Sequence, residues 1–184
     1  MHMQYLEARA SDAERIALLH AKSWQCTYRG VLCDEFLDSD VVQNRLVHWQ
    51  QRLNSLEKNQ LVLLAEEGEF TQGFVCIFGK ADAQWGALLD NLHVRPEMKR
   101  QGLGTELMHK AGAWVQANFP QSGMHLWVFE ANYPARWSYE RLGATSQCRE
   151  VGKVPGGGIV ASLRYVWASV EPLLELKKDA RIRT

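Results

Sequence analysis

Hydrophobic and polar positions along the chain predict strands and helices in alternation. Residues 4–9 are typical of a short strand, and the apolar positions within 13–19 then recur at helical spacing. Ser11, with Glu14 three residues later, forms a capping-box pattern that opens this first helix. The helix is expected to end near Gly30.

The middle of the chain predicts a hairpin, a third strand and a long helix. Residues 61–66 and 73–78 are apolar, strand-like runs on either side of a turn region, and residues 88–94 form the next strand, which stops before Pro96. Helical spacing begins at Leu103 and ends near Pro120. The other predicted elements are a helical region over 34–56, a strand over 125–130, a short helix over 135–142, and hairpin strands over 144–152 and 158–167. Since hairpins are mixed with crossovers, we expect a mixed sheet covered by helices.

Length and charge narrow the class of protein. The chain has 184 residues and 46% hydrophobic residues, which suits one globular domain over residues 1–184. Its 21 basic and 21 acidic side chains balance, so we expect no nucleic-acid partner and no membrane partner. The N-terminus lacks the basic flank and apolar core of a signal peptide, and the apolar runs are too short to span a bilayer. We therefore expect a cytoplasmic protein.

The four cysteines carry no recognisable motif. Cys26, Cys33, Cys76 and Cys148 are too far apart for a CxxC pair, and no histidine lies near them at zinc-finger spacing. We interpret them as reduced thiols, with no metal site and no activated nucleophile.

The segment most informative about chemistry joins the strand over 88–94 to the helix that follows. Gly102 and Gly104 lie at this turn, where glycine allows backbone N–H groups to approach a ligand closely. The N-terminus of the helix adds partial positive charge, and Lys99 and Arg100 add two cations, so the turn favours a phosphate or pyrophosphate. Leu107 stands where a dinucleotide fingerprint needs its third glycine, and the lysine of a P-loop is absent.

This turn resembles the acyl-CoA-binding motif of the GNAT superfamily of N-acetyltransferases. That motif reads arginine or glutamine, two residues, glycine, one residue, then glycine or alanine, and Lys99 is a departure at its first position. A second resemblance follows at the family's spacing, in the strand over 126–130, Asn132 and the helix that carries Tyr139. Ser138 and Ala144 replace the usual phenylalanines there. Together the two motifs cover about residues 60–168.

The resemblance implies an α+β fold of layered α/β/α type with the GNAT architecture. Its sheet is expected to be mixed, largely antiparallel and six- to seven-stranded, with splayed central strands. It also implies a bacterial-type enzyme in which residues 1–58 shape the acceptor side, 60–168 form the acetyl-CoA-binding core and 169–184 form a C-terminal tail. The basic tail from residue 177 onward is a frayed helix end or a subunit contact, and a homodimer is possible.

The resemblance also assigns roles to individual residues. Acetyl-CoA is expected between the strand ending at Val94 and the strand over 125–130, with Asn132 on the pantetheine arm and Tyr139 as the general acid. A phenol has a reference pKa near 10 and is protonated at neutral pH. The expected cofactor-binding residues are Leu92, His93, Val94, Lys99, Arg100, Gln101, Gly102, Leu103, Gly104, Thr105, Asn132 and Tyr139.

Three residues are alternatives for the general base. Strand alternation places Asp90 on the same face as Leu88, Leu92 and Val94, and a carboxylate there would point toward the acceptor. His93 would point to the other face unless the strand is bulged. Asp90 is the first choice and Glu130 the third alternative, and an ordinary polar role is favoured over that of the base for each of the three. A chain of water molecules would serve in place of a single residue.

The N-terminal third carries the candidate acceptor residues. Trp24 and Tyr28 are four residues apart on one helical face, where they would wall an acceptor pocket or pack together in the core. The acidic residues within 34–40 would attract a cationic amine or stabilise a helix N-terminus. The resemblance implies direct acetyl transfer, in a ternary complex, to a primary amine of a small molecule or peptide. The alternative is an acyl-CoA-binding module without turnover.

Overall fold

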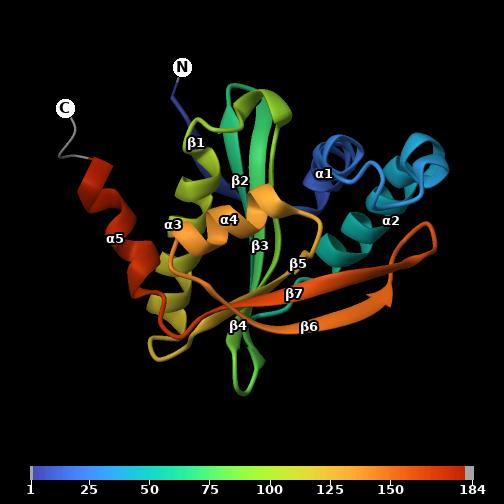
Figure 1. Cartoon of the computed structure of the whole chain (residues 1–184). Coiled ribbons are helices and arrows are strands. Elements are labelled where there is room, and N and C mark those ends of the chain that lie inside the picture. Colours follow the sequence, from blue (N-terminus) through green and yellow to red (C-terminus); the bar gives the residue numbers. More distant parts are fainter. Residues whose placement is uncertain (1, 181–184) are drawn as a thin grey trace.

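Seven strands form one mixed sheet in the computed structural model, which describes residues 2–180 (Figure 1). The strands are β1 (Gln4–Glu7), β2 (Gln60–Glu67), β3 (Phe70–Asp82), β4 (Gly86–Val94), β5 (Met124–Phe129), β6 (Thr145–Lys153) and β7 (Ile159–Trp167). Their order across the sheet is β1-β2-β3-β4-β5-β7-β6. Only β4 and β5 pair in parallel, while the other neighbours are antiparallel. The predicted mixed, largely antiparallel sheet is confirmed.

Helices cover both faces of this sheet. They are α1 (Ala13–Thr27), α2 (Val41–Asn54), α3 (Leu103–Asn118), α4 (Tyr133–Arg141) and α5 (Glu171–Ala180), with shorter helical turns at Ala10–Asp12, Phe36–Asp40 and Pro96–Met98. Figure 1 shows α1 and α2 on one side of the sheet and α3 and α5 on the other. Within residues 2–180, no helix is both long enough and apolar enough to cross a membrane.

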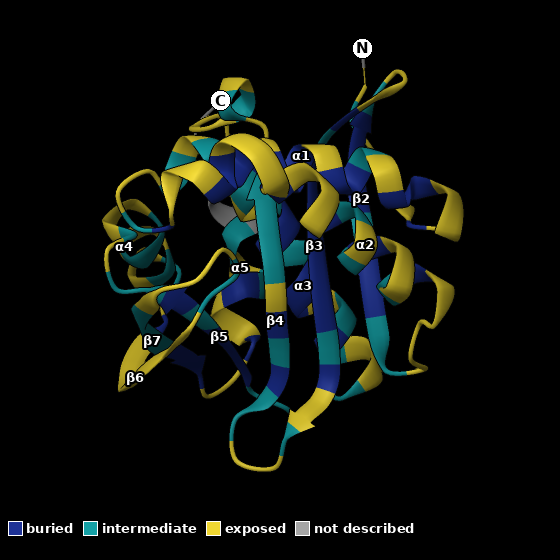
Figure 2. Cartoon of the chain, turned by 90° about the vertical axis from the view of Figure 1, so that its right-hand side faces the viewer, coloured by how far each residue is buried: buried dark blue, intermediate teal, exposed yellow. Residues whose placement is uncertain are grey.

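The central strands are apolar without alternation because each face of the sheet is buried. On β3, Phe74 and Cys76 pack toward α1 and α2, while Val75 and Ile77 pack into the cluster that contains α3. Figure 2 shows β3 buried along most of its length. Strands covered on both faces are typically continuous hydrophobic runs, which is why residues 61–66 and 73–78 could be identified from the sequence.

Two local features differ from the sequence prediction. The turn Ala10–Asp12 precedes α1 and moves its N-cap to Asp12, so the capping box predicted at Ser11 is wrong. The backbone N–H of Arg9 instead donates to Asp12 Oδ2 at 2.7 Å. Helix α5 was not predicted as an element, and its Leu173 is fully buried against Gly112 of α3. Residues 181–184 of the predicted basic tail lie outside the described residues.

The hairpin of β6 and β7 reaches across to the segment between α1 and α2. Every residue of β6 is exposed, as Figure 2 shows, yet the tip of the hairpin is packed. A Cβ atom on Gly156 would lie 2.3 Å from Cγ of Phe36, and Val154 and Val160 pack on the same cluster. The hairpin tip and the α1–α2 connection therefore meet on the side of the sheet that carries α1.

Gly79 of β3 gives a test of the packing on the α3 face. A Cβ atom there would lie 1.9 Å from the Phe119 ring, so Gly79→Ala is expected to lower the free energy of unfolding by about 1–3 kcal/mol. Urea unfolding checks this value. Gly152→Ala on β6 is the matched control, since nothing lies within 4 Å of its Cβ position. Equal stability of the two variants would contradict the close contact between Gly79 and Phe119.

Candidate active site

Strands β4 and β5 separate soon after they begin to pair. Their parallel register joins only Ala87 to Met124 and Leu88 to His125. Beyond these pairs, β4 continues to Val94 while bonded only to β3, and β5 continues to Phe129 while bonded only to β7. The splayed central strands are confirmed, and the backbone edge of residues 92–94 that faces β5 has no strand partner.

The glycine turn has the backbone conformation that an anion-binding turn requires. Gly102 is the N-cap of α3 with φ of +86°, and Arg100 also has a positive φ, of +63°. The first N–H groups of a helix lack partners within it, so those that follow Gly102 are available to a ligand. Gln101 Nε2 donates to the carbonyl of Glu97, and Lys99 Nζ lies 3.4 Å from Thr27 Oγ1 at the end of α1.

Gly104 is the second residue of α3, and the space beside its Cα atom is open. A Cβ atom there would meet only Cγ2 of Val94, at 3.9 Å. The protein's own packing therefore does not require glycine at this position. The residues present fit a pyrophosphate, because Gly102, Gly104 and the first N–H groups of a helix lie together at this turn.

Tyr139, Asn132 and Tyr28 converge from different elements beside β5. Asn132 caps α4 through its bond from the Ala135 N–H, and its Nδ2 lies 3.5 Å from the hydroxyl of Tyr28 on the other side of the sheet. Burial and the nearby Tyr28 raise the pKa of Tyr139 above its usual range, so its phenol stays protonated. Burial likewise raises the pKa of Tyr28.

The sequence left two roles open for the aromatic pair at the end of α1, namely packing in the core or lining an acceptor pocket. The two rings differ in this respect. Trp24 and Tyr28 lie edge to face with ring centroids 5.9 Å apart, and Tyr28 stacks in the same way on Phe129 of β5 at 4.9 Å. Trp24 is buried in the cluster under the α1–α2 connection, whereas Tyr28 is partly exposed at its edge. Tyr28 is therefore the member of the pair that lies beside Asn132.

A bulge in β4 changes which face its side chains occupy. Ile77 pairs with Leu89 and Cys76 with Asn91, which leaves Asp90 as the extra residue. Beyond the bulge the alternation is inverted, so Leu92 and Val94 pack toward α3. The prediction that Asp90 shares their face is wrong, because simple alternation does not hold across a bulge.

Asp90 and His93 consequently both face α1 and α2. Asp90 forms an ion pair with Arg52 of α2. His93 Nδ1 lies 2.9 Å from Ser23 Oγ on α1, and its ring is 4.2 Å from that of His20. The third base candidate, Glu130, is instead held by Arg149 of β6 through a two-oxygen ion pair at the surface.

Burial keeps His93 neutral. Burial, together with the charges of Lys99 and Arg45, lowers the pKa of His93 to about 3. Burial similarly lowers the pKa of His20 well below its usual range, with His93 and Arg45 adding to the effect.

These histidines make stability dependent on pH with a definite sign. The unfolded chain protonates His93 below about pH 6.5, whereas the folded chain resists protonation until pH 3, so its contribution is complete above pH 6.5 and is lost as the pH falls. His93 alone is expected to reduce the free energy of unfolding by about 2 kcal/mol at pH 5 relative to pH 7.5. Urea unfolding at both values measures this. In His93→Gln, the difference in the free energy of unfolding between the two pH values should be smaller by about 2 kcal/mol. The same difference as in the wild type would refute the lowered pKa of His93.

The acidic residues after α1 are held by the chain itself. Arg29 pairs with Asp34 at 3.3 Å and with Asp38, so these carboxylates close the loop between α1 and α2. Glu35 and Asp40 are exposed next to this loop. The cysteines are free thiols, with Cys76 buried and the other three exposed.

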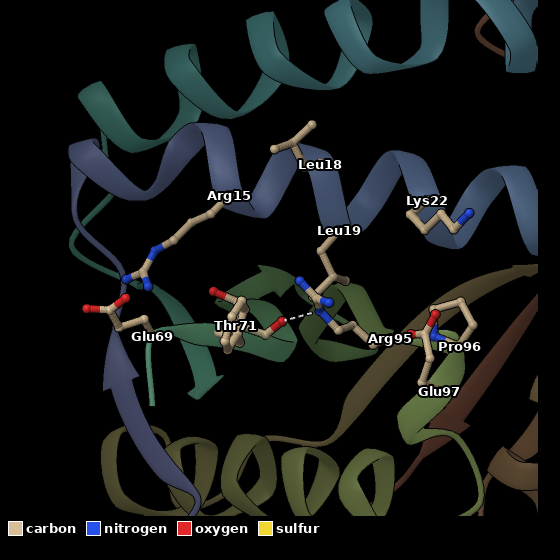
Figure 3. A pocket seen from close by; sticks show the side chains of 10 residues that line it. Arg15, Leu18, Leu19, Lys22, Glu69, Thr71, Arg95, Pro96 and Glu97 are labelled. Atoms are coloured by element: carbon tan, nitrogen blue, oxygen red, sulfur yellow. Dashed lines mark hydrogen bonds between the residues drawn. The ribbon is translucent and has the colours of Figure 1, made fainter. Parts of the chain in front are cut away.

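A surface pocket of about 350 Å³ is lined by other residues. Figure 3 shows it between α1 and the start of β3, where Arg95 Nε donates to the carbonyl of Thr71. Lys22 and Glu97 lie at its other end. None of the predicted site residues lines it.

Four residues beside the predicted site were missed by the sequence analysis. These are His20, Ser23, Arg45 and Arg52, all on α1 or α2. The available signal was the presence of polar side chains at positions that the helical period buries: Ser23 is 6% exposed and Arg45 is 8% exposed.

Residues 21–144 match the model of the acetyltransferase (GNAT) family. The chain is 31% identical over 130 residues to the uncharacterised N-acetyltransferase YuaI of Bacillus subtilis, covering 68% of this chain and 71% of that protein.

Solved structures share the fold at low identity. The PaiA N-acetyltransferase of Thermoplasma acidophilum, solved in complex with coenzyme A, is 19% identical with a TM-score of 0.64, covering 91% of this chain and 100% of that one. The yncA protein of Salmonella typhimurium, solved with its cofactor acetyl-CoA, is 17% identical with a TM-score of 0.64, covering 91% and 94%. The resemblance carried by the two motifs is confirmed, and the chain belongs to the GNAT family of acetyltransferases.

Proposed function

We propose that this protein transfers an acetyl group from acetyl-CoA directly to an amine of a small molecule or peptide. The observation that carries the proposal is the separation of β4 from β5, with the Gly102 turn at one end of the opening and Tyr139 beside it. Related structures solved with coenzyme A and with acetyl-CoA support the choice of donor. Acetyl-CoA, when bound, supplies an acetyl group activated as a thioester.

The residues of the turn bind and orient the donor. The N–H groups of residues 100–105 would donate hydrogen bonds to the pyrophosphate oxygens, with Lys99 and Arg100 nearby. The free edge of Leu92 to Val94 pairs with the pantetheine arm, and an N–H of this edge polarises the acetyl carbonyl. Asn132 contacts the same arm from the start of α4.

Tyr139 holds the proton that the leaving sulfur needs. Its raised pKa keeps the proton on Oη until negative charge develops on the thiolate. No cysteine takes part, so the transfer proceeds in one ternary complex.

Two side chains on the acceptor face of β4 are available to receive the amine proton. His93 is neutral, with its Nδ1 2.9 Å from Ser23 Oγ, and Asp90 forms an ion pair with Arg52. With a pKa near 3, His93 is a weak base, so we propose that the proton leaves through water bonded to His93 or Asp90.

Thiol release with a panel of amines tests the proposal. Acetyl-CoA is expected to bind saturably in a calorimetric titration, and at least one amine should then release free coenzyme A thiol at a rate above hydrolysis. A folded protein that does not bind acetyl-CoA would contradict the donor assignment. Binding without thiol release across the panel would favour the non-catalytic acyl-CoA-binding module.

A further inference from the structure

Arg45 of α2 is a buried cation without a carboxylate partner. It is 8% exposed, and among residues 2–180 it forms no ion pair with Asp or Glu. Its guanidinium lies 4.3 Å from the centre of the Trp24 ring, and its hydrogen bonds go to the side chain of the adjacent Asn44. Arg52, two turns further along α2, is by contrast paired with Asp90. Burying a charge costs free energy unless an opposite charge pairs with it. A bound anion would therefore stabilise the buried guanidinium of Arg45.

The neighbouring His20 presents a second buried donor. His20 Nδ1 accepts a hydrogen bond from Nε1 of Trp49 at 3.0 Å, and indole can only donate, so the His20 proton is on Nε2. His20 is 1% exposed, and its Nε2 has no hydrogen-bond partner among the described residues. Nε2 of His48, one turn from Arg45, is also buried without a partner.

The charged side chains around His20 and His48 carry a net positive charge. Arg45 and Arg52 both lower the pKa of His20 and of His48, after burial itself, and Asp90 is the carboxylate that offsets them at His48. Burial and the charge of Arg52 lower the pKa of Arg45 to about 10, with Asp90 acting in the opposite direction, and Arg45 stays charged at neutral pH. One positive charge therefore remains uncompensated in this cluster.

The cluster of His20, Arg45, His48, Arg52 and Asp90 adjoins the acceptor side of the proposed active site. Arg45 covers the face of Trp24, and Trp24 in turn contacts Tyr28, which lies beside Asn132. The charge of Arg45 is also felt at His93 on the bulged strand β4. An anionic group near Arg45 would thus belong to a molecule whose amine lies toward β4.

We propose that Arg45 binds a carboxylate on the acceptor, so that the protein acetylates small amines that carry a carboxylate, as amino acids do. This inference rests on the proposed acetyl transfer and names its acceptor class. Polyamines and unsubstituted alkylamines are disfavoured, because they would bring positive charge, or no anion, to a cluster that already has excess positive charge.

Matched pairs of acceptors test this inference. Amino acids and their primary amides, which differ only in the carboxylate, are compared by thiol release at saturating acetyl-CoA. The wild-type protein is expected to show a kcat/KM for the best amino acid at least about ten-fold above that for its amide. In Arg45→Met, KM for the amino acid should rise about 30-fold or more, with a smaller change in kcat, and the preference over the amide should disappear.

Control variants separate charge recognition from packing. Arg45→Lys keeps the charge and should recover part of the preference, whereas a purely structural role would make it as poor as Arg45→Met. Lys58→Gln removes an exposed cation outside the cluster and should behave as wild type. Each variant is first titrated with acetyl-CoA, and an unchanged affinity shows that its donor site is folded.

Histidine ring signals in NMR give a readout that does not need turnover. A carboxylate bound at Arg45 would shift the ring signals of His20 and His48, and the matching amide would not. Amides or diamines acetylated as well as amino acids would overturn the inference. So would intact acetyl-CoA binding with neither acetylation of any amino acid nor a shift of these signals, an outcome that leaves the proposed donor in place. Failure to bind acetyl-CoA would instead overturn the proposed function.

Discussion

Gly104→Trp is expected to abolish acetyl-CoA binding while the protein stays folded. The substitution places an indole at the turn that we propose holds the pyrophosphate, within the first turn of α3. The backbone of Gly104 has no positive φ, and its Cβ position meets only Val94, at 3.9 Å, so the side chain extends into space that the chain does not use. Steric exclusion of the donor should then raise Kd by about 100-fold or more, equivalent to about 2.7 kcal/mol.

Calorimetric titration measures this loss. Gly152→Trp is the matched control, because Gly152 lies on the exposed strand β6 with nothing within 4 Å of its Cβ position. The control should bind acetyl-CoA with wild-type affinity and so show that an added indole is not harmful in itself. Wild-type affinity in Gly104→Trp would remove the donor from this turn.

Tyr139→Phe is expected to reduce kcat by about 10²-fold or more, with little change in the affinity for acetyl-CoA. General acid catalysis contributes about 10²–10⁴-fold to enzyme rates, and the variant removes only the hydroxyl that holds the proton. The ring would remain in its contacts with Tyr165 and Trp167, whose centroids lie 6.2 Å and 6.1 Å away. The loss should therefore appear in the chemical step and not in folding.

Thiol release at saturating donor and acceptor measures kcat for this variant. Tyr133→Phe provides the control, since Tyr133 begins the same helix but is 69% exposed. Its kcat should equal that of the wild type. A kcat within about three-fold of wild type in Tyr139→Phe would rule out the proposed acid role, because such a change is smaller than the contribution of a general acid.

The elements with strong local signals were predictable from the sequence. The long helix α3 carries its apolar residues at helical spacing, and β2 and β3 are continuous apolar runs because both of their faces are covered. The turn at Gly102 was recognisable because a left-handed N-cap followed by a helix needs glycine. Helix α5 was missed although the sequence carries its apolar pattern: Leu173 and Leu176 lie at helical spacing and pack on the cluster that contains α3.

Side-chain orientation on β4 was predictable only in part. Alternation is a local rule, and it fails at Asp90 because β4 inserts one residue opposite a single residue of β3. The bulge is a property of the pairing of two strands, and no residue type in the segment marks it. The side of the sheet on which Leu92, Val94 and Asp90 lie therefore follows only from the register between β3 and β4.

The sequence by itself determined the order of the elements from β1 to β7, the glycine turn and the family, because the signal for each lies in residues close together along the chain. Only the tertiary structure decided which polar groups meet. Ser23 and His93 are 70 residues apart, and Asp90 and Arg52 are 38 residues apart. It also decided that Arg45 is buried without a carboxylate, because burial and the lack of a partner depend on what every other element brings to that point.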